Sequence, residues 1–227
     1  MPTVQTIIAN GVSISVRTWL GDDARFPPVV LLAGTGATAQ DWDTVATDLS
    51  ADRRVHAVDV RGHGPSAWPG TYSIDLMAQD VIALLPKLAR SIDVIGHSLG
   101  GLVACKAAAG STAVRRLVLE DVGVPHPRPS AALARPDGRL DFDWAVVEQV
   151  RPEIDDPDPR WPQILADISA PTLVIGGGPS SFVPSTHVAE LANCVEHGSR
   201  ITIDAGHLIH ATEPEQFVAA VRGHLDS

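Results

Sequence analysis

A serine between two glycines is the first feature of this chain that could carry out chemistry. Ser98 has Gly96 and Gly100 two residues away on either side. An apolar run, residues 92–95, precedes the motif, and an alanine-rich stretch, residues 99–109, follows it. A strand that turns sharply into a helix requires glycine at these places, because side chains there would collide with the turn. The pattern predicts that Ser98 presents an exposed hydroxyl able to attack a carbonyl carbon.

A histidine late in the chain could activate this serine. Among the nine histidines, His207 follows an apolar segment, residues 201–203, and a glycine. A neutral imidazole is the expected acceptor of a hydroxyl proton near pH 7. His210 lies one helical turn further on, but neither an H-E-x-x-H motif nor a carboxylate cluster accompanies the two histidines. We therefore expect His207 to act as a base and expect no metal site.

A glycine-rich loop could stabilise the negative charge that such an attack creates. Gly34-Thr35-Gly36 follows the apolar run at residues 28–33. Glycine would let this loop approach the turn that holds the serine, so the backbone amides of Thr35 and Leu99 could together bind an oxyanion. The loop lacks the third glycine of a dinucleotide-binding fingerprint. We therefore expect no cofactor.

Alternating strand and helix patterns must position these residues. A hairpin is expected around Asn10-Gly11, and the remaining strands are expected at residues 28–33, 55–59, 92–95, 117–120, 172–175 and 201–203. Helices are expected at residues 40–49, 73–88, 99–109, 184–191 and 213–224. Thr212 and Glu215 have the spacing of a capping box for the last helix, with Pro214 in its first turn. The alternation predicts an α/β fold with a mainly parallel twisted sheet covered by helices on both faces.

One long segment interrupts the alternation. Residues 125–167 are rich in Pro, Asp and Arg, with a short helix expected near residues 144–150. A loop of this length inside a compact domain is usually functional, and we expect it to form a reduced lid. Six aromatic residues are candidates to line a pocket beneath it: Trp42, Trp68, Phe142, Trp144, Trp161 and Phe182.

Composition limits the class of partner. With 227 residues, of which 44% are hydrophobic, the chain is expected to form one domain over residues 1–227. A formal net charge of -10 would repel nucleic acids and anionic membranes, so a small molecule is the expected partner. No basic segment with a following apolar run begins the sequence, and no run of membrane-spanning length occurs, which favours a soluble cytoplasmic protein. Cys105 and Cys194 are expected to be buried thiols, and the pattern sets no oligomeric state.

Two further motifs make the sequence resemble a known superfamily. Residues 61–66 read R-G-H-G-P-S after the fourth expected strand, and Gly206-His207 follows the last one. With the Ser98 motif, these resemble the α/β-hydrolase superfamily over about residues 3–225, the insert excepted. The resemblance implies that Ser98 is the nucleophile, that His207 is the base, and that the amides of Thr35 and Leu99 form the oxyanion hole. It also implies that residues 61–66 are chiefly structural.

The sequence departs from this superfamily at the third catalytic residue. The superfamily usually places a carboxylate after the seventh strand, where this chain has Ser180. Ala33 likewise replaces the histidine that commonly precedes the oxyanion loop. Some relatives place the acid after the sixth strand, a position that Asp121 occupies here, with Glu120 directly before it. We predict that Asp121 accepts a hydrogen bond from His207, the alternatives being Glu120 and a dyad without a carboxylate.

A serine nucleophile limits the class of reaction that the chain could catalyse. Attack by Ser98 on a carbonyl gives an acyl-serine that water can cleave, whereas attack on an alkyl halide or epoxide would leave a stable ether. Dehalogenase and epoxide hydrolase activities are therefore disfavoured. We expect hydrolysis of an ester, lactone or thioester of a small to medium apolar substrate. The alternatives are a carbon–carbon bond hydrolase, lyase or cyclase on the same fold, and a homologue that binds a ligand without catalysis.

Overall fold

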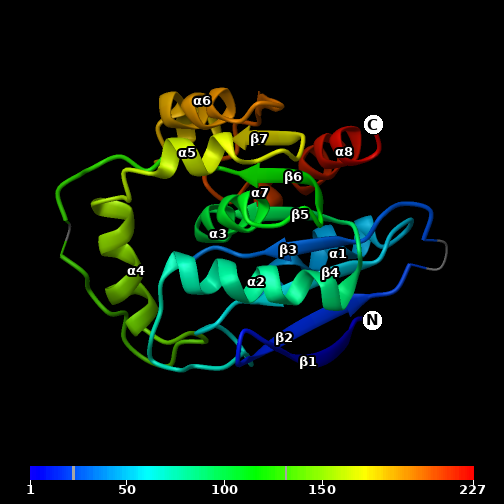
Figure 1. Ribbon diagram of the computed structural model, residues 1–227, viewed down its shortest axis with the longest axis horizontal. Helices are drawn as coiled ribbons and strands as arrows, with labels where there is room; N and C mark the ends of the chain where they lie inside the picture. Colours follow the sequence, from blue (N-terminus) through cyan, green and yellow to red (C-terminus); the bar gives the residue numbers. More distant parts are fainter. Residues whose placement is uncertain (22–23, 131) are drawn as a thin grey trace.

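A twisted eight-stranded sheet forms the centre of the molecule (Figure 1). The computed structural model describes residues 1–21, 24–130 and 132–227. The strand order is β1-β2-β4-β3-β5-β6-β7-β8, and only the pairs β1/β2 and β2/β4 are antiparallel. The strands are β1 Thr3–Ala9, β2 Val12–Trp19, β3 Val29–Leu32, β4 Val55–Asp59, β5 Ile92–His97, β6 Val114–Glu120, β7 Thr172–Gly176 and β8 Gly198–Thr202. The prediction of a mainly parallel sheet is confirmed.

Helices cover both faces of this sheet. The helices are α1 Asp43–Leu49, α2 Ile74–Leu88, α3 Leu99–Ala109, α4 Ala145–Asp155, α5 Trp161–Ala166, α6 Ser185–Cys194, α7 Ile209–Thr212 and α8 Pro214–Leu225, with 3-10 turns η1 Ala39–Trp42 and η2 Gly178–Ser180. Along β3, Val30 and Leu32 pack with α2 and α3, whereas Val29 and Leu31 pack with α1 and α8. Successive strand residues point to opposite faces of the sheet. One apolar strand therefore contributes side chains to two hydrophobic cores, one on each face.

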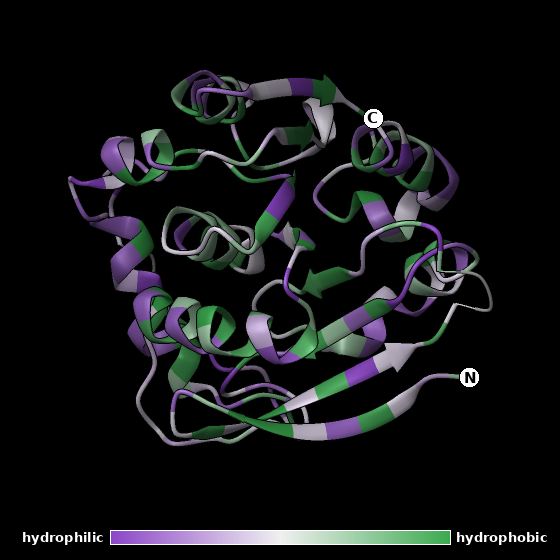
Figure 2. Ribbon diagram, turned by 45° about the vertical axis from the view of Figure 1, so that its right-hand side comes forward, coloured by the Kyte–Doolittle hydropathy of each residue, from purple (hydrophilic) through white to green (hydrophobic). Residues whose placement is uncertain are grey.

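The two strands at the N-terminal edge have a different pattern from the central ones. Hydrophilic and hydrophobic residues alternate along β1 and β2 (Figure 2). The turn between them has positive φ at Asn10 and Gly11, 48° and 78°, as the predicted tight turn requires. Among the described residues, no helix has the length and apolar character needed to cross a membrane.

The insert at residues 125–167 has more structure than the sequence indicates. It contains two helices, α4 and α5, where one short helix was expected, and Ala131 lies outside the described residues. In Figure 1, α4 stands at one side of the molecule, apart from α5 and α6. The segment before α4 is fixed to the loop after β4, because Gly64 N–H donates to Asp141 O at 2.7 Å and Asp143 N–H donates to Gly62 O at 2.8 Å.

The predicted capping box at the last helix is wrong. Thr212 ends α7 instead of capping α8, and the N-cap residue of α8 is Glu213, which makes no side-chain capping bond. The cause is local: the Glu213 N–H donates to Ile209 O at 2.8 Å, so the residues before it already form a helical turn. Pro214 does occupy the first position of α8, as predicted.

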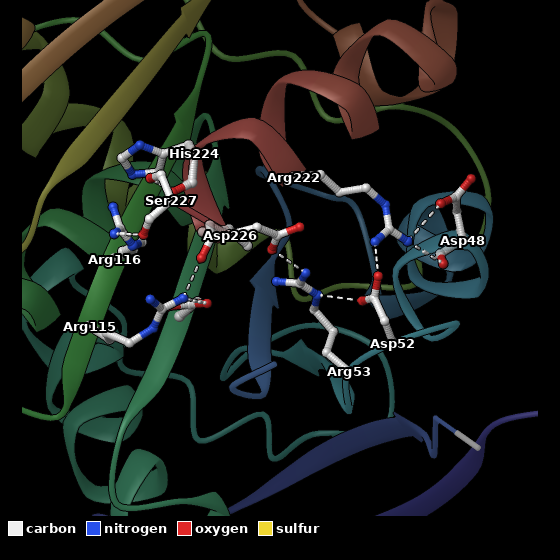
Figure 3. Close-up of polar contacts among 11 residues, drawn as sticks. Asp48, Asp52, Arg53, Arg115, Arg116, Arg222, His224, Asp226 and Ser227 are labelled. Carbon is white, nitrogen blue, oxygen red and sulfur yellow. Dashed lines mark hydrogen bonds and ion pairs between the residues drawn. The ribbon is translucent and has the colours of Figure 1, made fainter. Parts of the chain in front are cut away.

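Ion pairs made by Arg53 and Arg222 hold α8 in place (Figure 3). The Arg53 side chain is fully buried and binds Asp52 at 3.0 Å and Asp226 at 2.5 Å. Arg222 on α8 binds Asp52 as well, and Asp48 at 3.2 Å. These contacts join the end of α8 to the chain between α1 and β4. They matter for the site because α8 follows the loop that carries His207.

Replacing the two arginines should give different losses of stability. Arg53→Ala removes a fully buried guanidinium group that pairs with two partly exposed carboxylates, 22% and 27% exposed, and should lower the free energy of unfolding by about 2 kcal/mol. Arg222→Ala, at a side chain that is 25% exposed, should cost about 1 kcal/mol or less. Urea unfolding of the two variants measures the difference. Equal losses would contradict the assignment of Arg53 as the main anchor.

Candidate active site

Ser98 lies at the sharp turn between β5 and α3. Its backbone has φ 52° and ψ -120°, a strained conformation for a residue with a side chain. A Cβ atom on Gly96 would lie 2.5 Å from Gly100 O, and one on Gly100 would lie 2.3 Å from Leu32 O. Glycine is therefore required on both sides of the serine, as predicted. The strain at Ser98 sets its side chain at the carboxyl end of the sheet.

Two backbone amides predicted to bind an oxyanion lie in segments that meet beside Ser98. Leu99 is the first residue of α3, so its N–H has no acceptor within the helix. Within the described part of the chain, the Thr35 N–H also has no hydrogen-bond acceptor. The loop before Thr35 touches the turn, because a Cβ on Gly34 would lie 3.2 Å from the Ser98 Cβ. The helix N-terminus adds a favourable dipole for negative charge there.

His63 fixes the loop that carries Thr35. The Gly36 N–H donates to His63 Nε2 at 3.2 Å, and His63 Nδ1–H in turn donates to Arg61 O at 3.2 Å. The ring is buried and stacks on Phe142, with centroids 5.7 Å apart. Burial lowers the pKa of His63, which keeps Nε2 available as an acceptor. His63 therefore supports the loop, in agreement with a structural role for residues 61–66.

Asp121 and His207 form the hydrogen bond predicted from the sequence. Asp121 Oδ2 lies 2.7 Å from His207 Nδ1, and the carboxylate is 1% exposed. Asp121 has φ 47° directly after β6, which turns its side chain out of the strand pattern. Gly177 N–H donates to Oδ1 at 2.8 Å and Ser181 Oγ–H donates to Oδ2 at 2.5 Å. The carboxylate is thus held by three donors.

The usual position of the acid holds no catalytic group in this structure. Ser180 ends the 3-10 turn η2 and is exposed. The adjacent Ser181, which the sequence did not single out, is the residue that supports Asp121. The local sequence shows only that Ser181 is a short polar residue two places before Val183. The Val183 N–H also donates to the Ser181 hydroxyl, at 2.9 Å.

The other ring nitrogen of His207, Nε2, makes no hydrogen bond within the described part of the chain. Because Nδ1 donates to a carboxylate, Nε2 carries the lone pair. Phe182 packs against the imidazole with ring centroids 4.2 Å apart and is itself 75% exposed. Within the described residues, Ser98 Oγ makes no hydrogen bond, and the contact of Ser98 with His207 stays a prediction. Such contacts commonly tighten only when a substrate binds.

His97 joins the turn at Ser98 to the loop that carries His207. Its Nε2–H donates to His207 O at 2.9 Å, and the two rings lie 4.6 Å apart. Its Nδ1 is buried without a hydrogen-bond partner. Burial lowers the pKa of His97 to about 4, so the ring is neutral at pH 7. A neutral ring donating to a backbone carbonyl holds the loop that carries His207 without adding a charge beside it.

Glu120 pairs with His210 rather than with His207. Its carboxylate accepts hydrogen bonds from the His210 backbone N–H and from His210 Nδ1, both at 2.8 Å. The two side chains are 0% and 4% exposed. Trp42 stacks on the His210 ring with centroids 4.3 Å apart. The alternative of Glu120 as the partner of His207 is therefore wrong, and Trp42, a candidate for a pocket wall, packs in the core.

The remaining aromatic candidates and the cysteines fall into two groups. Trp161, another candidate, is 2% exposed beneath the Lys106 ammonium group and packs in the core. Trp68 is exposed, and Phe142 and Trp144 are half-buried. Both cysteines are free: Cys105 is buried and Cys194 is half-buried. Among the described residues, no group of three or more histidine, cysteine or acidic side chains could hold a metal ion.

Comparison with known proteins agrees with this geometry. A sequence model of a protein family, described as the alpha/beta hydrolase family, matches residues 29–220. The chain belongs to the alpha/beta hydrolase family. An esterase of Mycobacterium tuberculosis is 30% identical over all of this chain and 90% of its own, and an esterase of Escherichia coli is 27% identical over 88% and 93%. A solved E-2-(acetamidomethylene)succinate hydrolase has a TM-score of 0.85 at 20% identity, covers both chains fully, and shows the fold alone.

The buried pair in this hydrolase should matter more to stability than its exposed counterpart. Glu120→Ala leaves two buried donors of His210 without an acceptor and should cost about 3 kcal/mol of unfolding free energy. Glu190→Ala breaks a similar contact with His126, but there the side chains are 43% and 42% exposed, and it should cost about 1 kcal/mol or less. Urea unfolding compares the two. A loss for Glu120→Ala no larger than for Glu190→Ala would contradict the burial argument.

Acidification should destabilise the fold through His97. Its folded pKa is about 4 against 6.5 in a free chain, so the unfolded state binds more protons between these values and stability falls as the pH falls. The loss from this residue between pH 7 and pH 5 is about 2 kcal/mol. His97→Asn should flatten the dependence of unfolding free energy on pH by that amount. A slope equal to that of the parent would show that His97 is not buried in its neutral form.

Proposed function

We propose that this alpha/beta hydrolase cleaves an ester, lactone or thioester of a small to medium apolar substrate through an acyl-serine at Ser98. The observation that carries the proposal is the 2.7 Å contact of Asp121 with His207, made by a buried carboxylate at the edge of the sheet where Ser98 lies. Such a contact fixes the tautomer that a serine hydrolase needs. Two esterases among the similar proteins support the same class of reaction.

In the proposed acylation, Ser98 attacks and His207 acts as base. Asp121 holds Nδ1–H, so Nε2 of His207 takes the hydroxyl proton while Ser98 Oγ forms a bond to the carbonyl carbon. The carbonyl oxygen becomes an oxyanion, which accepts hydrogen bonds from the amides of Thr35 and Leu99. Collapse of this intermediate breaks the bond to the leaving alcohol or thiol, which receives the proton from His207. The acyl group stays on Ser98.

In the proposed deacylation, water takes the place of Ser98 as the attacking group, and the same sequence of steps follows. His207 takes a proton from water as the water oxygen attacks the acyl-serine carbonyl. The second oxyanion accepts hydrogen bonds from the same two amides. Its collapse releases the carboxylic acid and returns the proton to Ser98 Oγ. With a lactone, the acid and alcohol leave as one hydroxy acid.

Two features favour a neutral, apolar acyl group. The exposed ring of Phe182 packs on His207 and offers an apolar surface beside the base. The net charge of -10 disfavours polyanionic partners, in line with a small-molecule substrate. A phenyl ring at this place contributes by burying apolar surface of the substrate.

Phe182→Ala should therefore act on substrate binding. We expect an increase in KM that grows with acyl chain length in a series of p-nitrophenyl esters, and a smaller change in kcat, since the ring contacts no reacting atom in the proposed mechanism. Ile8→Ala, at another exposed apolar residue, on the edge strand β1, serves as the control. A uniform fall in kcat with unchanged KM would contradict a binding role for the ring.

Substitution of the proposed nucleophile and base tests the reaction class. Ser98→Ala should abolish both fluorophosphonate labelling and p-nitrophenyl ester hydrolysis, with the circular dichroism spectrum retained. His207→Ala should lower turnover by roughly 10³-fold or more. His197→Ala, at an exposed histidine beside the start of β7, at the opposite end of the strands from Ser98, should change turnover little.

Two outcomes would contradict the ester-cleaving proposal in different ways. Labelling of Ser98 without hydrolysis of any ester in the panel would favour a carbon–carbon bond hydrolase, lyase or cyclase. Neither labelling nor hydrolysis would favour a ligand-binding homologue without catalysis.

A further inference from the structure

The loop that carries the Thr35 amide is a tight turn. The Ala37 N–H donates to Gly34 O at 3.2 Å, and Gly36, the third residue of the turn, has a φ of 78°. These are the features of a type II turn. A type I turn has the same closing hydrogen bond but the opposite orientation of its central peptide, whose N–H belongs to Gly36. The direction of the Gly36 N–H therefore decides which form the loop takes.

The His63 side chain accepts a hydrogen bond from this N–H. His63 Nε2 lies 3.2 Å from the Gly36 nitrogen, which is at the long end of the range for N–H donors. The strength of the bond therefore depends on where the buried His63 ring lies. His63 Nδ1 contacts Arg61 O at 3.2 Å, which sets the direction of the ring but does not cover its faces. The position of the ring depends on the residue that packs on its face.

Phe142 of the insert is that residue. Its ring lies nearly parallel to the His63 ring, with centroids 5.7 Å apart and planes at 16° to each other. The same phenyl ring reaches the turn, because a Cβ atom on Gly36 would lie 3.0 Å from Phe142 Cε1. One aromatic side chain therefore packs against both partners of the hydrogen bond between Gly36 and His63.

The backbone around Phe142 is fixed to the loop that holds His63. The two residues form an antiparallel β-bridge. Next to Phe142, the Asp143 carboxylate accepts a hydrogen bond from the buried Tyr72 hydroxyl at 2.7 Å. By contrast, residues 132–139 of the insert are all exposed. The insert therefore meets the oxyanion loop through one well-held segment that ends its exposed part.

We propose that Phe142 is a positioning residue for the oxyanion site. By packing on His63 and Gly36, it holds the turn in the form that directs the Thr35 N–H toward the carbonyl oxygen of the substrate. This inference rests on the proposed ester cleavage at Ser98, and it makes the insert a part of the oxyanion-binding structure as well as a cover. Phe142 contacts no reacting atom in that mechanism. Its effect passes through His63 and acts on the oxyanion rather than on the intact ester.

Steady-state kinetics of p-nitrophenyl ester hydrolysis test this role. Phe142→Ala should lower kcat by about 10-fold to 100-fold with little change in KM, which is less than the roughly 10²- to 10³-fold loss caused by removing an oxyanion donor outright. The inhibition constant of an alkyl trifluoromethyl ketone, which forms an oxyanion when a serine adds to it, should rise by the same factor. Phe142→Leu keeps part of the apolar contact and should lose less, so the test does not depend on the folding of the alanine variant.

A double-variant comparison tests the route through His63. His63→Ala should lower kcat to a similar degree. The variant with both changes should lose little more than either alone, because the two side chains act on one hydrogen bond. Leu140→Ala removes a half-buried apolar side chain from the same segment and should leave kcat close to that of the parent. Circular dichroism verifies that each variant keeps the fold.

Three outcomes would overturn this inference alone. A rise in KM with unchanged kcat in Phe142→Ala would make the ring a wall of the substrate pocket. Losses in kcat that multiply in the double variant would mean that the two residues act separately. An equal loss in Leu140→Ala would assign the effect to the segment as a whole. A parent protein that hydrolyses no ester would contradict the proposed function, and this inference with it.

Discussion

The carboxyl end of β6 places two buried carboxylates side by side, and the geometry of the site depends on them. Asp121 binds His207 at 2.7 Å, and Glu120 binds His210 at 2.8 Å. The backbone carbonyl of Glu120 also accepts the Ser98 N–H at 3.2 Å. One strand end therefore fixes the turn at Ser98 and both histidines of the segment after β8. Charges this deeply buried are tolerated only when paired, so the loop cannot move away without a large cost.

The rest of the fold supports this arrangement from two sides. On one side, His97 donates to the His207 carbonyl from the strand next to β6, and His63 holds the oxyanion loop through Gly36. On the other side, the buried Arg53 anchors the end of α8, the helix that follows the His207 loop. The strained turn at Ser98 requires glycine on both sides, because a Cβ atom at Gly96 or Gly100 would collide with the backbone. The site is thus assembled by long-range contacts onto a rigid sheet.

Much of the fold and part of the site can be predicted from the sequence, because the elements follow from residues that are close together in the chain. Strand and helix alternation predicts the parallel sheet, and glycine spacing predicts the turn at Ser98. The Asp121 to His207 hydrogen bond was predicted from the resemblance to relatives that place the acid after the sixth strand, and from the expected position of that strand beside β5. The chain order of serine, acid and histidine left few other positions once Ser180 replaced the usual acid.

The features that the sequence did not predict depend on distant parts of the chain. Glu120 and His210 are 90 residues apart, and only the packing of α7 against β6 brings them together. Trp42 lies in the core because the His210 ring offers it a surface, which its own segment does not indicate. The prediction of a capping box is wrong for a similar reason, because Thr212 is part of the helical turn α7. Local patterns predict elements, whereas pairing across the sheet requires the fold itself.

The rate at which a fluorophosphonate labels Ser98 in Asp121→Asn, relative to the parent, tests the account most directly. Asparagine retains the shape of the side chain but removes the charge that fixes the His207 tautomer and stabilises the imidazolium. The account predicts a fall in the labelling rate of roughly 10³-fold or more with the fold intact. A labelling rate close to that of the parent would contradict it, because Ser98 would then be activated without the carboxylate at the end of β6.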